Sequence, residues 1–259
     1  MVTRVGAAEC ADERPAWLGA LAQDMQRLDH RSTAERVAGL LRRSITEGEM
    51  PPRTHLSEEQ LIAVFQVSRN TLREAFRLLT HEGLLTRWLH RGVYVRELTE
   101  ADLVDLYRLR RIIECSIVRD LDDPGDDLLR PLLDDVKASQ ESIERGDWVS
   151  VGTANMSFHA HLVALAGSPR TNEVIETLLA QLRLAFHTAA SPQRLHEPYV
   201  ARNRALLDLI TEGEYEQAAG QLEVYLQDSR AELVNAIRGQ RIHANGSPGA
   251  AQMRTLHSR

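Results

Sequence analysis

The chain has 259 residues, with 43% hydrophobic and 26% charged side chains, which is typical of a globular protein with room for two domains. It contains no apolar run close to the roughly 20 residues that span a bilayer and no evident signal peptide, so we expect a cytoplasmic protein without a membrane partner. The net charge of −6 argues against nucleic-acid binding, but residues 32–97 hold ten Arg against eight Asp or Glu and are locally basic.

The first 31 residues have no clear globular pattern. Five apolar side chains could line one side of a short helix, namely Trp17, Leu18, Leu21, Met25 and Leu28. We interpret residues 1–31 as an N-terminal extension that packs on its own chain or on a partner subunit. The two cysteines, Cys10 and Cys115, are far apart in sequence, which favours free thiols over a disulfide.

Three helices are predicted after this extension. Ser32 and Glu35 form a capping box in front of the first helix, which ends at Gly48 before two prolines. Ser57 and Gln60 indicate a second capping box, in front of a short apolar helix that lies only two residues before the next cap, Ser68. Two short helices joined so tightly predict a helix-turn-helix.

The third helix, which begins after Ser68, carries two different faces. At about 100° per residue, its apolar residues share one stripe: Leu72, Ala75, Phe76 and Leu79. Its first turn and its other side hold the candidate DNA-binding residues Arg69, Asn70, Thr71, Arg73 and Arg77. Guanidinium and small polar groups suit the phosphate oxygens and base edges of double-stranded DNA. For such a helix in isolation, a solvated arginine-rich face is the alternative.

A β-hairpin is predicted next. Residues 84–88 and 93–96 are rich in strand-forming residues, and the turn between them contains His90, Arg91 and Gly92. Three helices followed by a hairpin predict a winged helix-turn-helix domain over residues 32–97. The hairpin tip could then reach the groove or backbone beside the third helix.

The segments V-S-R-N-T-L-R-E-A-F-R-L-L and H-R-G-V-Y-V, in register over about residues 33–96, resemble the DNA-binding domain of GntR-superfamily transcription regulators. The resemblance implies that Arg69, Arg73 and Gly92 approach operator DNA, together with their neighbours Asn70, Thr71, His90 and Arg91. Glu59 departs from the pattern, because some members carry a DNA-contacting arginine there. The second helix is therefore expected to contribute less to binding.

From Thr99 the pattern changes to amphipathic helices without strand signals. Residues 98–238 are predicted to form an antiparallel all-α bundle, so the whole fold is mainly α. Its last helix is expected over about residues 215–238. We expect a loop at residues 191–198 and a disordered tail at residues 239–259.

The segments Asp105–Glu114 and Asn155–Pro169 resemble helices of the FCD ligand-binding domain in the FadR subfamily of GntR regulators. Many FCD domains bind a divalent metal through one Asp and three His. The matching positions here are Asn155, His159, Asn203 and Tyr225. Only one of four ligands is retained, so we predict no metal and no cofactor.

Those four residues are instead candidate effector-binding residues, because polar groups inside a bundle need hydrogen-bond partners. Arg110 matches an arginine that the family often places near an effector carboxylate, and it is the fifth candidate. Two alternatives remain open. Arg110 could pair with Glu114 one turn on, and His159 alone is more often a satisfied core histidine than a ligand.

The leading hypothesis is a homodimeric transcription regulator that binds a palindromic operator, and repression is favoured over activation. We expect it to respond to a small organic effector, a carboxylate or acyl compound. No catalytic motif supports an enzyme. Two alternatives are a metal-dependent all-α enzyme that uses a cavity at His159, and a regulator whose helical domain only dimerises.

Overall fold

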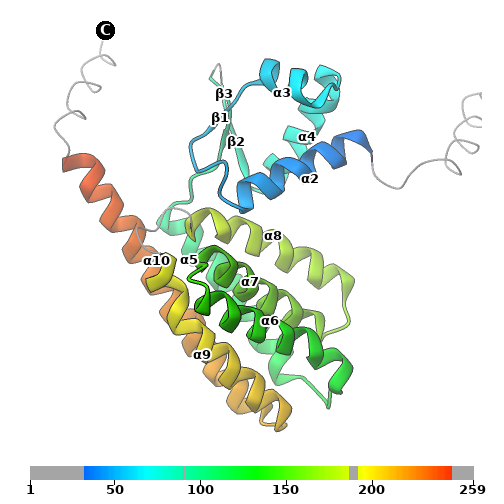
Figure 1. Cartoon of the computed structure of the whole chain (residues 1–259), viewed down its shortest axis with the longest axis vertical. Coiled ribbons are helices and arrows are strands. Elements are labelled where there is room, and N and C mark those ends of the chain that lie inside the picture. Colours follow the sequence, from blue (N-terminus) through cyan, green and yellow to red (C-terminus); the bar gives the residue numbers. More distant parts are fainter. Residues whose placement is uncertain (1–31, 90, 187–191, 247–259) are drawn as a thin grey trace, which may run out of the picture.

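The computed structural model describes residues 32–89, 91–186 and 192–246, which form a small head and a helical bundle (Figure 1). The head contains helices α2 (Thr33–Thr46), α3 (Glu58–Phe65) and α4 (Arg69–His81), and strands β1 (His55–Leu56), β2 (Leu85–Trp88) and β3 (Gly92–Val95). The bundle contains α5 (Glu100–Arg119), α6 (Asp126–Glu144), α7 (Trp148–Ala164), α8 (Pro169–Phe186), α9 (Pro192–Thr211) and α10 (Tyr215–Gly246). The predicted mainly α fold is confirmed.

The caps of the head helices follow the sequence signals. Ser32 and Glu35 form a complete capping box on α2. Ser57 accepts a hydrogen bond from the backbone of Gln60, so this half of the second predicted box is present on α3. Gln66 ends α3 with a left-handed backbone (φ 53°), and this turn leads directly to Ser68, the cap of α4. The helix-turn-helix is thus set by local chemistry.

The wing is a three-stranded antiparallel sheet in the order β1-β3-β2. The predicted hairpin corresponds to β2 and β3, with Trp88 opposite Gly92. The sequence did not predict β1, a two-residue strand that pairs His55 with Tyr94. So short a strand gives no alternating pattern to detect.

The bundle differs from its prediction at two places. Residues 192–198, expected to be a loop, form the start of α9, because Pro192 occupies the first helical position, where no N–H is needed. α10 continues to Gly246, well into the predicted tail, since no proline interrupts the chain before Pro248. The predictions for residues 1–31, for Cys10 and for residues 247–259 lie outside the described residues. Cys115 is a buried free thiol.

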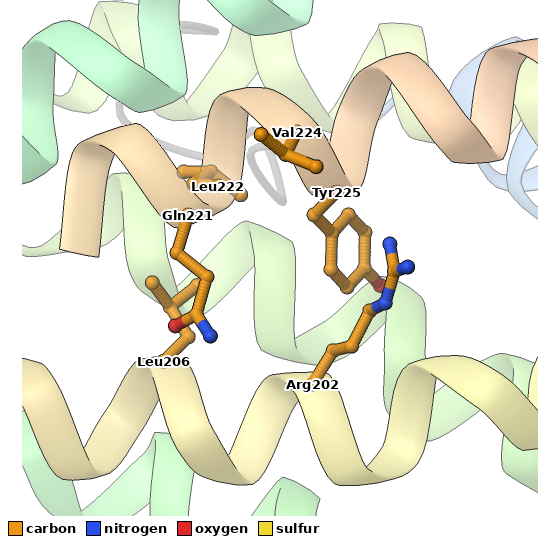
Figure 2. Close-up of a pocket in the computed structure, with 6 residues that line it drawn as sticks. All are labelled: Arg202, Leu206, Gln221, Leu222, Val224 and Tyr225. Carbon is orange, nitrogen blue, oxygen red and sulfur yellow. The ribbon is translucent and has the colours of Figure 1, made fainter. Parts of the chain in front are cut away.

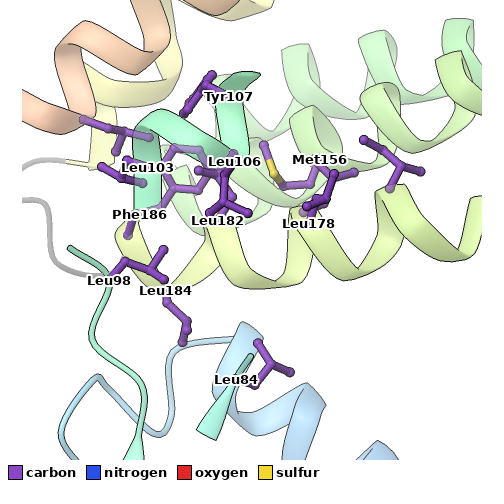
Figure 3. Packing of buried hydrophobic residues seen from close by; sticks show 14 of the residues in the cluster. Leu84, Leu98, Leu103, Leu106, Tyr107, Met156, Leu178, Leu182, Leu184 and Phe186 are labelled. Carbon is purple, nitrogen blue, oxygen red and sulfur yellow. The ribbon is translucent and has the colours of Figure 1, made fainter. Parts of the chain in front are cut away.

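One continuous apolar core joins the head to the bundle. Figure 3 follows it from Leu84 in the head, past Leu98 and Leu184, to Leu182 and Met156 in the bundle. Burial of these side chains drives docking of the two parts. Across the described residues, each helix is too short or too polar to span a bilayer.

Polar contacts from α8 fix the head as well. The Gln181 amide donates to the carbonyl of Glu82, the C-cap of α4, over 2.8 Å. The Arg183 guanidinium donates to the carbonyl of Thr46, at the end of α2, over 3.0 Å and to Thr153 Oγ1 on α7 over 2.7 Å. Both donors therefore satisfy helix-terminal carbonyls that have no partner within their own helices.

Candidate nucleic-acid interface and buried polar network

The arginine-bearing side of α4 is open to solvent. The side chains of Arg69, Arg73 and Arg77 are 65%, 51% and 70% exposed. The opposite stripe, Leu72, Ala75, Phe76 and Leu79, is buried as predicted. The bundle does not cover the arginines, so in this conformation the helix can present them to another molecule.

Glutamates hold these arginines in the free protein. Glu58 accepts from Arg73 Nε at 3.0 Å and lies 3.9 Å from Arg69 Nε. Glu74 pairs with Arg77 at 2.6 Å, and this hydrogen bond lowers the pKa of the Glu74 carboxyl. Such exposed pairs are weak, because water competes for both charges. Phosphate oxygens can therefore replace the carboxylates with little loss of free energy.

The first turn of α4 offers two small polar residues. Asn70 is exposed, whereas Thr71 is half-buried, with its hydroxyl 2.8 Å from Ser68 Oγ. Ser68 Oγ also accepts the backbone N–H of Thr71 at 3.1 Å. This cap fixes the direction in which the turn points, so Asn70 is the freer of the two for a base edge.

The tip of the wing depends on a glycine. Gly92 has φ +99°, and a Cβ there would lie 2.8 Å from His55 Nε2. Only glycine fits both the backbone angle and the space. Arg91 beside it is exposed, and its carbonyl accepts the Tyr94 hydroxyl at 3.0 Å. His90, the remaining predicted contact, lies outside the described residues.

The five candidate effector residues come together inside the bundle. Their exposed fractions are 1% for Arg110, 5% for Asn155, 0% for His159, 2% for Asn203 and 3% for Tyr225. They project from α5, α7, α9 and α10. The structure thus places in one connected network residues that are far apart in sequence.

Arg110 pairs with Glu114, the alternative that its spacing left open. Arg110 Nε lies 2.7 Å from Glu114 Oε1, and Glu114 Oε2 lies 2.7 Å from His159 Nδ1. Burial works to raise the pKa of Glu114, but attraction to the Arg110 guanidinium and the hydrogen bond with His159 outweigh it and lower that pKa. Burial also lowers the pKa of His159, and attraction to Glu114 offsets this only in part. The network therefore holds one ion pair and a neutral imidazole near pH 7.

The other half of the network consists of neutral groups. Tyr225 Oη lies 3.1 Å from His159 Nε2 and 2.9 Å from Asn155 Oδ1, which also accepts from Asn203 Nδ2 at 2.7 Å. A hydroxyl has one hydrogen, so Tyr225 can donate to only one of its two neighbours while His159 is neutral. Asn203 Oδ1 is buried without a hydrogen-bond partner. This acceptor calls for a donor from outside the network.

The network does not suit a divalent metal. His159 already uses both ring nitrogens, toward Glu114 and Tyr225, and amide or phenol groups replace the other ligands. Within the described residues, no group of three or more His, Cys, Asp or Glu is placed to hold a metal ion. His161 lies on the same helix, is 41% exposed and pairs with Asp135 at 2.6 Å, away from the network.

A pocket of about 180 Å³ between α9 and α10 borders the network (Figure 2). Tyr225 forms part of its wall, with Arg202 and the apolar Leu206 and Leu222. Arg202 Nη2 pairs with Asp228 at 2.8 Å, but its Nη1 is buried without a partner. Sequence reasoning missed Arg202, because nothing in its spacing separates it from an exposed helix residue.

Comparison with known proteins agrees with this division of the chain. A sequence model of the gntR family of bacterial regulatory proteins matches residues 33–95, and a model of the FCD domain matches residues 105–228. Each match falls on one of the two parts described above.

Relatives cover most of the chain. A GntR transcriptional regulator of Rhodococcus sp. RHA1 with a solved structure is 38% identical, with a TM-score of 0.75 over 80% of this chain and 99% of its own. The Nta operon transcriptional regulator of Aminobacter aminovorans is 28% identical over 73% of this chain and 88% of its own length. The gluconate operon transcriptional repressor of Bacillus licheniformis is 32% identical over 52% of this chain and 56% of its own.

These relatives are regulators and not enzymes, and the metal-dependent enzyme is thereby excluded as the chain's function. The chain belongs to the GntR family of bacterial transcription regulators and carries an FCD domain behind its DNA-binding head.

Proposed function

We propose that this protein is a cytoplasmic, homodimeric repressor of the FadR subfamily, which binds a palindromic operator and is controlled by a small organic acid. Each subunit presents α4 to one half-site, so the two-fold symmetry of the dimer matches that of the operator. The proposed DNA contacts are those predicted from the sequence: Arg69, Asn70, Thr71, Arg73, Arg77, His90, Arg91 and Gly92.

One observation carries the DNA-binding part of the proposal. Three arginines on α4 are more than half exposed, and strand β2 of the wing packs on the same helix. Exposed guanidinium groups at the start of a recognition helix can donate two hydrogen bonds to a guanine edge or reach phosphates. Glu58, which faces Arg69 and Arg73, would release both arginines when DNA binds.

The test uses duplexes selected from a random-sequence pool by the purified protein. We expect a selected site with two-fold symmetry. The double variant Arg69→Ala, Arg73→Ala should lose roughly 30-fold or more in the affinity ratio between selected and scrambled duplex, since each base contact contributes about 1–3 kcal/mol. The control is Arg130→Ala, on an exposed arginine of α6. An unchanged ratio in the double variant would remove α4 as the reading element.

Two unpartnered buried atoms on α9 support the effector part. Arg202 Nη1 is a donor on a residue that lines the pocket, and Asn203 Oδ1 is an acceptor inside the network, which Tyr225 joins to that pocket. A carboxylate would satisfy the arginine, and a hydroxyl on the same molecule could serve the asparagine. The adjoining pocket of about 180 Å³ favours a small acid over a long acyl compound.

Thermal unfolding with a panel of small carboxylates and hydroxy acids tests this. A ligand at about 100 times its Kd adds roughly 2.7 kcal/mol to the stability of the folded protein, and the melting temperature rises. The same compound should weaken binding to the selected duplex, and Arg202→Met should lose both effects. A panel in which no acid changes either quantity would favour a helical domain that only dimerises.

A further inference from the structure

A second cationic surface lies between the recognition helix and the wing, which stand side by side in the head (Figure 1). It is a groove of about 350 Å³. Arg73, Arg77 and His81 line it from α4, and Arg87 lines it from β2. His81 and Arg87 are not among the predicted DNA contacts.

The floor of this groove is apolar and belongs to the packed core of the head. Phe76 and Val93 are 4% and 5% exposed, and both belong to the core of the head. Thr80 lines the groove too, with its hydroxyl donating to the Phe76 carbonyl over 2.7 Å. No acidic side chain lines it among the described residues. The groove thus combines a cationic rim with a surface that can pack against a sugar.

Among the arginines that line this groove, Arg87 is the one whose side chain has no partner among the described residues. It stands opposite Val93 in the sheet and on the same side of β2 as the buried Leu85, which is the side toward α4. Its side chain is exposed, and within the described part of the chain it has no ion-pair or hydrogen-bond partner. Arg73 and Arg77, by contrast, are each held by a glutamate.

We propose that this groove holds the DNA backbone, with Arg87 as a phosphate contact opposite Arg77; the inference rests on the proposed function. If α4 lies in the major groove and the wing tip in the adjacent minor groove, the sugar-phosphate chain that separates them must pass between α4 and β2. That passage is the groove lined by Arg77 and Arg87. The contact reads no sequence, since every phosphate is alike, and it fixes the distance between helix and wing on the duplex.

The test compares Arg87→Ala, Arg87→Lys and the control Arg130→Ala as full-length proteins. Fluorescence anisotropy gives the affinity for the selected duplex and for a scrambled duplex of equal length, between roughly 50 and 200 mM salt. We expect Arg87→Ala to bind both duplexes about tenfold more weakly, with the ratio between them unchanged. The slope of log affinity against log salt should fall by about 0.9 for each phosphate that the variant no longer neutralises. Arg87→Lys should keep most of the slope.

Two results would overturn the inference. Arg87→Ala could bind both duplexes with the affinity and slope of the wild type, or it could lose affinity for the selected duplex alone, which would mean base reading. Failure of the proposed function has a different signature, because the wild type would then prefer no duplex at all. Since Arg87 is exposed and unpaired within the described residues, an unchanged melting temperature confirms that the variant is folded.

Discussion

Neutralising Glu114 should destabilise the bundle far more than neutralising a comparable acid on the surface. Glu114 and Arg110 are 0% and 1% exposed, so in Glu114→Gln the guanidinium stays buried without a counter-charge. Breaking such a pair on one side costs about 3–5 kcal/mol. For a protein of this size, that lowers the melting temperature by roughly 6–20 °C. Urea unfolding followed by circular dichroism measures the loss directly, provided that the slope with denaturant is unchanged.

The control is Glu223→Gln. Glu223 pairs with Arg111 over 2.8 Å, but these side chains are 35% and 48% exposed, so we expect a loss of at most about 1 kcal/mol. The double variant Arg110→Met, Glu114→Leu removes both buried charges and should recover much of the stability lost in Glu114→Gln. If Glu114→Gln loses no more than Glu223→Gln, the buried pair is not the electrostatic centre of the bundle.

Three further outcomes follow from the geometry. The folded-state pKa values of Glu114 and His159 lie below their ordinary values of 4.5 and 6.5, so the unfolded chain takes up protons more readily than the folded protein. The free energy of unfolding is therefore highest above about pH 6.5 and falls on acidification. A melting temperature that rises from pH 7 to pH 5 would contradict this. Gly92→Ala strains the wing against His55, and should weaken duplex binding about tenfold while the melting temperature falls by only a few degrees, as measured by anisotropy and calorimetry. Arg183→Met removes one hydrogen bond between the bundle and the head, to Thr46, and one within the bundle, to Thr153, so limited proteolysis should separate head and bundle sooner than in the wild type.

Local signals made the head predictable. The cap at Ser68 and the glycine at position 92 each act within a few residues, and their backbone angles follow the residue types. The left-handed backbone of Gln66 does not, because glutamine rarely adopts it. What the sequence did not provide was pairing between distant segments. The strand at His55 exists only because Tyr94 lies beside it, 39 positions further on in the wing. A two-residue partner leaves no pattern of its own.

The bundle site was predictable as a set of residues but not as a set of contacts. The resemblance to FCD domains selected Asn155, His159, Asn203 and Tyr225, and all are buried together. Whether Arg110 faces a ligand or Glu114 depends on burial of both side chains, and an i, i+4 spacing fits either case. Contacts such as that between Glu114 and His159 join residues of different helices, which no periodicity reveals.

Helix α7 offers a physical link between the buried polar network of the bundle and the arginine-bearing face of α4 in the head. It carries Asn155 and His159 of the network, and also Thr153, whose hydroxyl accepts from Arg183. The Arg183 side chain is buried, burial lowers its pKa, and its other hydrogen bond goes to Thr46 at the end of α2. A buried guanidinium cannot give up a partner without a large loss of free energy. An effector that displaced α7 would therefore move Arg183 along with it, and Arg183 would move the end of α2. Packed interiors shift between discrete arrangements and do not deform gradually, so these parts move as one. Since α2 packs on α4, a displacement of α2 is passed to the helix that carries Arg69 and Arg73.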